Sequence, residues 1–292
     1  MRGHKMGIAA AAILCLGIGT SSPGEAAQPP ERFKAASADC SETLLGVLTC
    51  KHDKVDLTGG ALGFATRRVY YALPQGTPPP GGWPVVLMFQ GSFFNAELCF
   101  QGHRLEPFGA YYQVLTVEKL LNAGFAVMAP QTHLDGVTFW DTDIPPFSFD
   151  WDLAPDSALM TAIFAAIGDG TFGSLDPGRL YATGISSGGY MTSRMAVSYA
   201  SKFKALAIQS ASYATCPVGP FCDVPALGTD HPPTLLLAGL LDPLVPVYTV
   251  EAYREQMVAA GIKTKMLVDP LASHQWIPAA PNEVVNWFLA SP

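Results

Sequence analysis

Residues 179–197 read RLYATGISSGGYMTSRMAV, and this stretch decides the fold that the sequence predicts. The apolar residues before Gly184 are typical of a buried strand, and those from Gly189 onward are typical of a helix. Between them, a Gly-x-Ser-x-Gly pentapeptide centred on Ser186 stands in the strand-turn-helix context of a nucleophile elbow. The alternative is an ordinary strand-helix turn without chemistry. We predict that Ser186 is a nucleophile at the top of a sheet, where the N–H groups of the next helix face a developing negative charge.

The rest of the chain alternates between strand-like and helix-like patterns. The predicted strands are 67–73, 84–90, 125–129, 180–185, 205–209, 234–238 and 263–268, and the predicted helices are 116–123, 155–167, 189–199, 247–260 and 282–289. This alternation predicts a single-domain α/β fold with a mostly parallel sheet and helices on both faces. Sites in such sheets form beyond the carboxyl ends of the strands. Two long, aromatic-rich loops, 93–109 and 131–152, follow strands and are expected on that side.

A serine nucleophile needs a base, and the base needs an orienting group. Asp242 follows the predicted strand 234–238, and His274 follows the predicted strand 263–268. The order Ser, Asp, His, with the last two after late strands, is that of a catalytic triad on this kind of sheet. The alternatives are a turn carboxylate before proline for Asp242 and an ordinary surface histidine for His274. The sequence favours the triad Ser186, Asp242 and His274.

Other acidic and histidine residues fit the triad pattern less well. Asp223 and Asp230 lie in the loop before the strand that leads to Asp242, and His231 lies in that loop too. His103 and His133 precede Ser186 and therefore break the expected order. Asp223 and Asp230 are the alternatives to Asp242 as the triad acid, and we expect His103 and His133 to border the cleft rather than to act in catalysis.

An oxyanion needs two N–H donors aimed at its developing charge. One is expected to be the backbone N–H of Ser187, directly after the nucleophile. The other is expected from the loop that follows strand 84–90. In this loop we favour the backbone N–H of Ser92, with Gly91 as the second candidate.

The first 27 residues have the pattern of a secretory signal peptide. Arg2 and Lys5 precede an apolar run over residues 7–19, and small residues with an expected cleavage region at 24–27 follow. The run is short for a bilayer span, and no later stretch is long and apolar enough to span a membrane. The sequence predicts a secreted protein whose catalytic domain comprises residues 28–292.

Composition limits the partners of the chain. The formal net charge of the 292-residue chain is −7. Nucleic acids and anionic membranes are therefore unsuitable partners, because both carry negative charge. Charged residues make up only 14% and the mean hydropathy is +0.24. A large core with a surface of small polar residues and an exposed apolar patch both explain these values.

Five of the six cysteines follow the predicted signal peptide, and in an exported protein they are disulfide candidates. Cys216 and Cys222 bracket a short loop and are predicted to pair. Cys40 is predicted to pair with Cys50 or with Cys99, and the odd count leaves one free thiol. The chain has no Cys-x-x-Cys motif or His-rich cluster that indicates zinc, so we expect neither a metal nor a cofactor.

The Gly-Ile-Ser-Ser-Gly box, with Asp242 and His274 at these spacings, resembles the extracellular medium-chain-length polyhydroxyalkanoate (PHA) depolymerases. The resemblance covers essentially the whole chain after the predicted signal peptide. It implies the α/β-hydrolase fold and hydrolysis of a water-insoluble polyester of 3-hydroxy fatty acids, such as poly(3-hydroxyoctanoate). Like that family, the chain lacks the linker and separate substrate-binding domain of the short-chain polymer depolymerases.

Without a binding module, the catalytic domain must adsorb to the polymer through its own apolar surface. The candidates lie in the two long loops, and we expect about half of them to be buried. They are Phe93, Phe94, Phe100, Phe139, Trp140, Phe147, Phe149 and Trp151. Of these we favour Phe93, Phe94, Trp140 and Trp151 as substrate-binding residues.

Two other functions compete with this interpretation. A secreted esterase of small or plant-wall esters, of the feruloyl or acetylxylan type, would share the fold and the triad. A catalytically silent hydrolase fold used for binding belongs to a different class, and the intact Ser-Asp-His set argues against it. The sequence leaves open the oligomeric state, the preferred monomer length and whether residues 212–233 form a lid.

Overall fold

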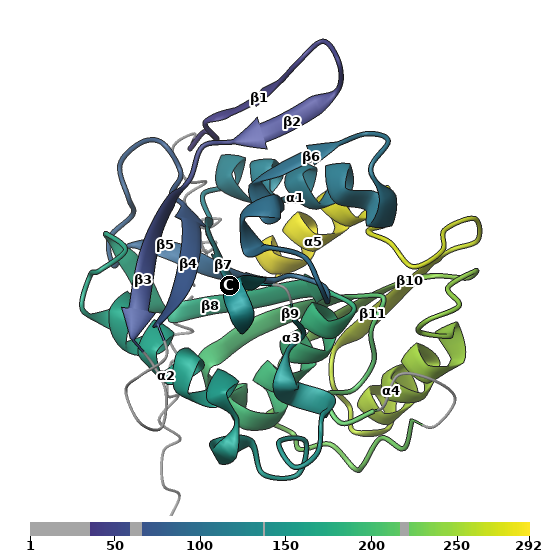
Figure 1. Ribbon diagram of the computed structural model, residues 1–292. Coiled ribbons are helices and arrows are strands. Elements are labelled where there is room, and N and C mark those ends of the chain that lie inside the picture. Colours follow the sequence, from purple (N-terminus) through teal and green to yellow (C-terminus); the bar gives the residue numbers. More distant parts are fainter. Residues whose placement is uncertain (1–35, 59–65, 137, 217–221) are drawn as a thin grey trace, which may run out of the picture. The chain divides into compact units, whose positions relative to one another are not determined.

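The computed structural model, shown in Figure 1, describes residues 36–58, 66–136, 138–216 and 222–292. The predicted signal peptide, with its cleavage region, lies outside the described residues. The described residues belong to one compact unit. Among them, no helix has the length and apolar character needed to cross a membrane.

An eight-stranded sheet forms the centre of this unit (Figure 1). In chain order its strands are β3 (Asp53–Thr58), β4 (Thr66–Ala72), β5 (Trp83–Phe89), β7 (Ala126–Pro130), β8 (Leu175–Ile185), β9 (Phe203–Gln209), β10 (Thr234–Gly239) and β11 (Thr264–Asp269). Across the sheet the order is β11-β10-β9-β8-β5-β7-β4-β3. The six strands from β11 to β7 are parallel, and β4 and β3 are antiparallel to their neighbours. The prediction of a mostly parallel sheet is confirmed.

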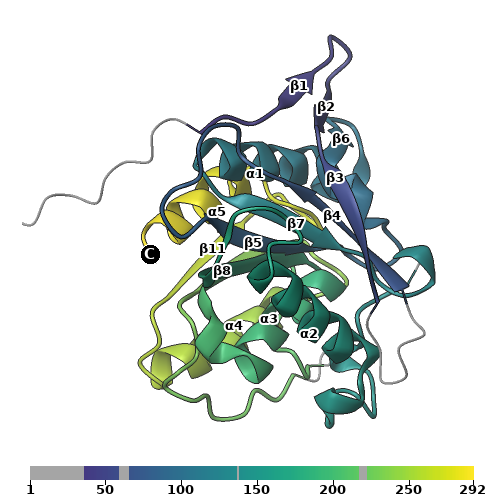
Figure 2. The same cartoon turned by 90° about the vertical axis from the view of Figure 1, so that its left-hand side faces the viewer.

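Helices cover both faces of the sheet, as Figures 1 and 2 show. One face is covered by α1 (Ala110–Asn122) and α5 (Ala280–Leu289), and the other by α2 (Pro155–Gly168), α3 (Ser187–Ser198) and α4 (Val247–Ala259). The central strands carry apolar residues on both faces, and all seven residues of β5 are buried. Burial on both sides explains why the central strands have continuous apolar runs rather than alternating ones.

The structure corrects several predicted elements. Helix α1 begins at Ala110, six residues before the predicted start at Thr116, because Tyr111 and Val114 extend its buried face by more than a turn. A small antiparallel sheet of β1 (Cys40–Glu42), β2 (Val47–Cys50) and β6 (Gln101–His103) was not predicted. The edge strand β3 was missed as well, because half of its residues are charged and most of them are exposed. The two long loops contain short helical turns rather than only irregular structure.

Both predicted disulfides are present, the one at Cys40 and the one between Cys216 and Cys222. Cys40 is bonded to Cys50, its partner in the register of β1 and β2, and this choice leaves Cys99 as a buried free thiol. Burial raises the pKa of the Cys99 thiol to about 12, which keeps it protonated and unreactive. Cys216 is bonded to Cys222.

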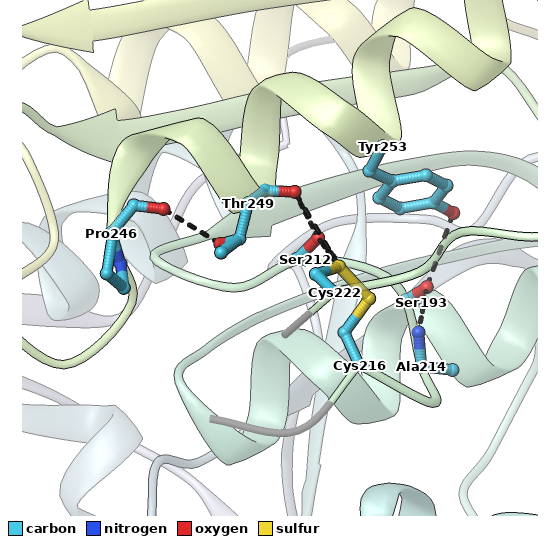
Figure 3. Close-up of a disulfide and its surroundings, with 8 residues drawn as sticks. All are labelled: Ser193, Ser212, Ala214, Cys216, Cys222, Pro246, Thr249 and Tyr253. Atoms are coloured by element: carbon cyan, nitrogen blue, oxygen red, sulfur yellow. Dashed lines mark hydrogen bonds between the residues drawn. A yellow bond between two sulfur atoms is a disulfide. The ribbon is translucent and has the colours of Figure 1, made fainter. Parts of the chain in front are cut away.

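The Cys216–Cys222 disulfide lies between α3 and α4 (Figure 3). The hydroxyl of Ser212 donates a 2.6 Å hydrogen bond to the Thr249 carbonyl in α4. The N–H of Ala214 donates a 3.0 Å bond to the Ser193 hydroxyl in α3. Residues 212–216, which we considered as part of a lid, are thus attached to both helices. Residues 217–221 of the same segment lie outside the described residues.

Candidate active site

The turn between β8 and α3 holds Ser186 in a conformation that few residues adopt. Ser186 has φ 56° and ψ −126°, outside the regions favoured by side chains of this type. A Cβ at Gly184 would lie 2.4 Å from the Gly188 carbonyl oxygen, and a Cβ at Gly188 would lie 2.1 Å from the Phe89 carbonyl oxygen. Any side chain at either glycine would therefore force the turn apart. The result is a half-buried serine at the carboxyl end of β8.

Asp242 and His274, predicted from different loops, form a direct hydrogen bond. His274 Nδ1 lies 2.8 Å from Asp242 Oδ2, and both side chains are buried. The other carboxylate oxygen, Oδ1, accepts the backbone N–H groups of Leu244 and Val245 at 2.9 Å. Because a carboxylate can only accept, the Nδ1 atom carries the proton, and Nε2 is left with its lone pair. This is the tautomer that a general base needs.

Gln209 connects the elbow to the loop of His274, and it was not among the predicted site residues. Its carbonyl oxygen accepts the Ser186 N–H at 3.1 Å, while its side-chain oxygen accepts the Ile277 N–H at 3.3 Å. The next residue, Ser210, donates a 3.4 Å bond to the Gln275 carbonyl. The signal in the sequence that could have identified Gln209 was its polar side chain at the end of an otherwise apolar strand. Both sides of the candidate site are thus attached to the end of β9.

The hydroxyl of Ser186 has no hydrogen-bond partner among the described residues. The hydroxyl can therefore rotate, and hydrogen bonds of this kind are often long in the absence of substrate and tighten when it binds. The positions of Ser186 and His274 support their predicted roles as nucleophile and base. No hydrogen bond joins the two side chains in the described structure.

The other candidate acids and bases lie elsewhere. His103 contacts the Leu45 carbonyl in the small sheet at 2.8 Å, and His231 is buried against Tyr253, with its Nε2 atom 2.6 Å from the phenol oxygen. Asp223 and Asp230 are exposed. Asp242 is the carboxylate that contacts His274 within the described part of the chain.

The loop after β5 lies against the elbow. A Cβ at Gly91 would be 3.7 Å from the Ser186 Cβ, which places the neighbouring Ser92 beside the nucleophile. The N–H groups of Ser92 and Ser187 have no acceptor among the described residues, whereas the Phe93 N–H donates to the Thr138 carbonyl at 2.9 Å. Ser92 and Ser187 remain the predicted oxyanion donors.

Two of the four favoured substrate-binding residues are buried, and this part of the prediction is wrong. Trp140 has no exposed surface; its indole N–H donates to the Gln90 carbonyl at 3.0 Å, and its backbone N–H donates to the Ser187 hydroxyl at 2.9 Å. Trp151 is 7% exposed and donates its indole N–H to the Tyr199 hydroxyl at 2.9 Å. Long loops need packing of their own, and these indoles provide it.

The remaining aromatic candidates differ in exposure. Phe100 is fully buried, Phe94 and Phe147 are half-buried, and Phe93, Phe139 and Phe149 are exposed. Phe93 and Phe94 remain predicted substrate-binding residues. The expectation that about half of the eight aromatics are buried agrees with these exposures.

Phe108 adjoins the candidate base and was not among the predicted residues. Its ring lies edge-on to His274 at 6.2 Å and edge-on to Phe94 at 5.4 Å, and it is 41% exposed. Its backbone has φ 60°, and its carbonyl accepts the Trp276 N–H at 2.9 Å. Because a left-handed phenylalanine has no sequence signature, the sequence did not indicate this position.

A buried ionic network lies next to Trp140. Asp156 pairs with Arg67 at 2.5 Å and accepts the Asp141 N–H at 2.7 Å; His133 lies between Arg67, at 2.8 Å, and Asp141, at 2.9 Å. Burial raises the pKa of Asp156 against the opposing effect of the Arg67 charge. His133, Asp141 and Asp156 have the donor atoms to hold a metal ion within 4.8 Å of one another. The Arg67 guanidinium already supplies a positive charge to Asp156, and His133 is the partner of Asp141.

One further carboxyl group near the site has an unusual pKa. Burial raises the pKa of Asp143 to about 6, although the nearby Arg194 guanidinium opposes the shift. Arg194 is itself buried and donates to the hydroxyl and the carbonyl of Thr142 at 2.8 and 2.6 Å. The loop 131–152 therefore buries charge as well as aromatic rings.

Comparisons with known proteins show which chains this protein is similar to. The chain is 46% identical over 263 residues to a poly(3-hydroxyoctanoate) depolymerase of Pseudomonas fluorescens, with 88% of this chain and 92% of that protein covered. No protein-family model matches the chain.

Solved structures of similar fold include a bacterial heroin esterase and a thermostable esterase. The heroin esterase has a TM-score of 0.56 and 16% identity, covering 84% of this chain and 83% of that one. The thermostable esterase has a TM-score of 0.56 and 17% identity, covering 82% of this chain and 62% of that one. At this identity the likeness concerns the fold, which is that of the α/β-hydrolases.

Proposed function

The chain belongs to the family of the poly(3-hydroxyoctanoate) depolymerases and is a carboxylic ester hydrolase, and from this premise we propose that it is a secreted enzyme that degrades a medium-chain-length polyhydroxyalkanoate. The substrate is an insoluble polyester of 3-hydroxy fatty acids, and the products are oligomers and monomers. The observation that carries the proposal is the buried Asp242–His274 hydrogen bond, in loops at the same edge of the sheet as Ser186.

In the proposed mechanism, the Ser186 hydroxyl attacks the ester carbonyl while His274 Nε2 accepts its proton. Asp242 holds the proton on Nδ1 and stabilises the imidazolium that forms. The N–H groups of Ser187 and Ser92 bind the oxyanion. His274 then donates this proton to the ester oxygen as its bond to the carbonyl carbon breaks, so the hydroxy acid leaves with a free hydroxyl and the acyl group stays on Ser186. Water, deprotonated by His274, then attacks the acyl group and releases it as a carboxylic acid. The chain's own residues supply every group in this scheme.

We also propose that the protein is exported and that its catalytic domain follows a signal peptide. The pattern of the first 27 residues supports a signal peptide, with residues 28–292 as the catalytic domain. The disulfides Cys40–Cys50 and Cys216–Cys222 support an oxidising compartment, because such bonds are rare in the cytosol.

The test is the clearing of suspensions of poly(3-hydroxyoctanoate) and poly(3-hydroxybutyrate) by the wild-type protein and by Ser186→Ala. We expect clearing of the longer-chain polymer alone. We expect Ser186→Ala to lose about 10⁶-fold in kcat while its circular dichroism spectrum stays unchanged, because the nucleophile is absent and the fold is not. Hydrolysis of soluble p-nitrophenyl esters without clearing of either polymer would favour the esterase of small or plant-wall esters instead.

A further inference from the structure

Four leucines lie exposed in the two loops that carry Asp242 and His274. Three of them, Leu240, Leu241 and Leu244, belong to the β10–α4 loop, residues 240–246, and are 50%, 60% and 49% exposed. The fourth, Leu271, belongs to the β11–α5 loop, residues 270–279, and is 85% exposed. We call these four residues the leucine edge. Covering these side chains would remove apolar surface from water, which is favourable.

Hydrogen bonds hold the two loops side by side. The Leu241 N–H donates to the Ala272 carbonyl at 3.0 Å, and the Ser273 hydroxyl donates to the Leu241 carbonyl at 3.4 Å. The Leu240 N–H donates to the Asp269 carbonyl at 2.9 Å. Figure 1 shows both loops, in yellow-green and yellow, projecting on the same side of the sheet beyond β10 and β11. The leucines are therefore presented by fixed backbone, and little conformational entropy is lost when they are covered.

The two loops that carry the leucine edge have no exposed ionisable side chain. Asp242 and His274 are the only ionisable residues in the two loops, and they are buried against each other. Asp269, which precedes the second loop, accepts the N–H groups of Leu271 and Ala272 at 2.9 and 3.1 Å. Pro243 and Pro270 are also exposed there. A surface of this kind offers nothing to a charged or strongly polar partner.

We propose that the leucine edge is the surface by which the enzyme adsorbs to the aliphatic side chains of its solid polyester. The inference rests on the proposed function and extends it, because it assigns adsorption to the loops that hold the acid and the base, in addition to the predicted contacts of Phe93 and Phe94. Its occupant is an uncharged aliphatic surface, which matches the leucines in polarity. Adsorption there also brings Asp242 and His274 to the polymer, since they lie in the same loops.

The experiment measures adsorption separately from hydrolysis. The parent is the inactive Ser186→Ala protein, and the variant also carries Leu240→Ser, Leu241→Ser, Leu244→Ser and Leu271→Ser. Each is mixed with poly(3-hydroxyoctanoate) granules, and the free protein is measured after sedimentation. We expect the variant to bind about 10-fold more weakly or worse, and we expect parent binding to be unchanged between about 0.05 and 0.5 M NaCl, because no charge takes part.

Two further variants make the result specific. Leu289→Ser alters a leucine of similar exposure, 48%, at the far end of α5, and should bind granules as the parent does. Methionine at the four positions keeps the apolar surface and should restore binding. In the active background, hydrolysis of a short soluble ester by the serine variant should stay within about 2-fold of wild type, since backbone bonds hold the two loops.

The outcomes separate this inference from the proposed function. If the parent binds granules and the wild type clears them, but the serine variant binds equally well, the leucine edge is not the adsorption surface. Binding that falls with salt, or equal losses in granule binding and soluble-ester turnover, would also overturn it. If the parent does not bind and the wild type clears no polymer, the proposed function fails and the inference fails with it.

Discussion

Two pairs of loops meet at the carboxyl edge of the sheet, and they differ in length and in what holds them in place. The long loops 93–109 and 131–152 bury Phe100, Trp140 and Trp151. The short loops 240–246 and 270–279 hold the acid and the base and leave four leucines exposed. A long connection must supply its own core, whereas a short one is fixed by its strand, its helix and a few backbone hydrogen bonds. Aromatic content therefore indicates how a loop is supported, and it does not by itself identify a substrate-binding surface.

The largest expected effect tests the short loops. Asp242→Asn keeps an oxygen for the Leu244 and Val245 N–H groups but turns an N–H₂ group toward His274 Nδ1. The imidazole must then carry its proton on Nε2 and cannot accept one from Ser186. We expect kcat to fall about 10⁴-fold on soluble and polymeric esters, with the unfolding midpoint in urea nearly unchanged.

Asp269→Asn is the matched control for this variant. Asp269 also accepts two backbone N–H groups in a neighbouring loop but contacts no histidine in the described structure. The Asp269→Asn variant should retain the kcat of the wild-type enzyme. A similar loss of kcat in both variants would mean that Asp242 acts only by shaping its loop.

The next effect tests the long loops. Trp140→Ala removes a fully buried indole and leaves the Gln90 carbonyl without its donor. We expect the free energy of unfolding to fall by about 3–5 kcal/mol, measured by urea denaturation. Phe149→Ala, in the same loop but 84% exposed, should change it by less than about 0.5 kcal/mol. Equal changes in the two variants would contradict the division between supporting and exposed aromatics.

The smallest effect concerns charge buried in a long loop. The pKa of Asp143 is raised by burial to about 6, so the folded protein binds this proton more tightly than the unfolded chain does. Stability is therefore lost as the pH rises from about 4 to 6 and stays reduced above that range. Asp143→Asn should raise the free energy of unfolding by about 1–3 kcal/mol at pH 7.5 and leave it unchanged at pH 3.5.

Urea denaturation at the two pH values measures this effect, and Asp152→Asn serves as its control. Asp152 is an exposed carboxyl of the same loop. The same change for both variants, or a gain for Asp143→Asn at pH 3.5 as large as at pH 7.5, would show that buried charge at position 143 does not limit stability.

The sequence predicted the part of the fold that local pattern controls. Strands such as β5 are apolar along their whole length, and this pattern identified them in the sequence. Gly184 and Gly188 identified the turn around Ser186. The edge strand β3 was missed because it is paired on one side only, half of its residues are charged and most of them are exposed. Pairing partners distant in the chain, rather than composition, create such strands.

The candidate site divides in the same way. Chain order was enough to select Asp242 and His274, which the structure brings into a hydrogen bond. The contributions of Gln209 and Phe108 depend on contacts between loops far apart in sequence, and Phe108 also on a left-handed backbone. Exposure of each aromatic residue depends on how the long loops pack, which no short pattern encodes. These features required the tertiary structure.

The most direct test of the central claim, that Ser186 is the nucleophile of a Ser-His-Asp esterase, is covalent labelling with a fluorophosphonate ester. The protein is treated with the probe, and the adduct is counted by intact mass and located by peptide mapping. The account predicts one adduct per chain, on Ser186, with loss of esterase activity in proportion to labelling and very slow labelling of Asp242→Asn. An adduct on a different residue, or full esterase activity in protein whose Ser186 is labelled, would contradict it.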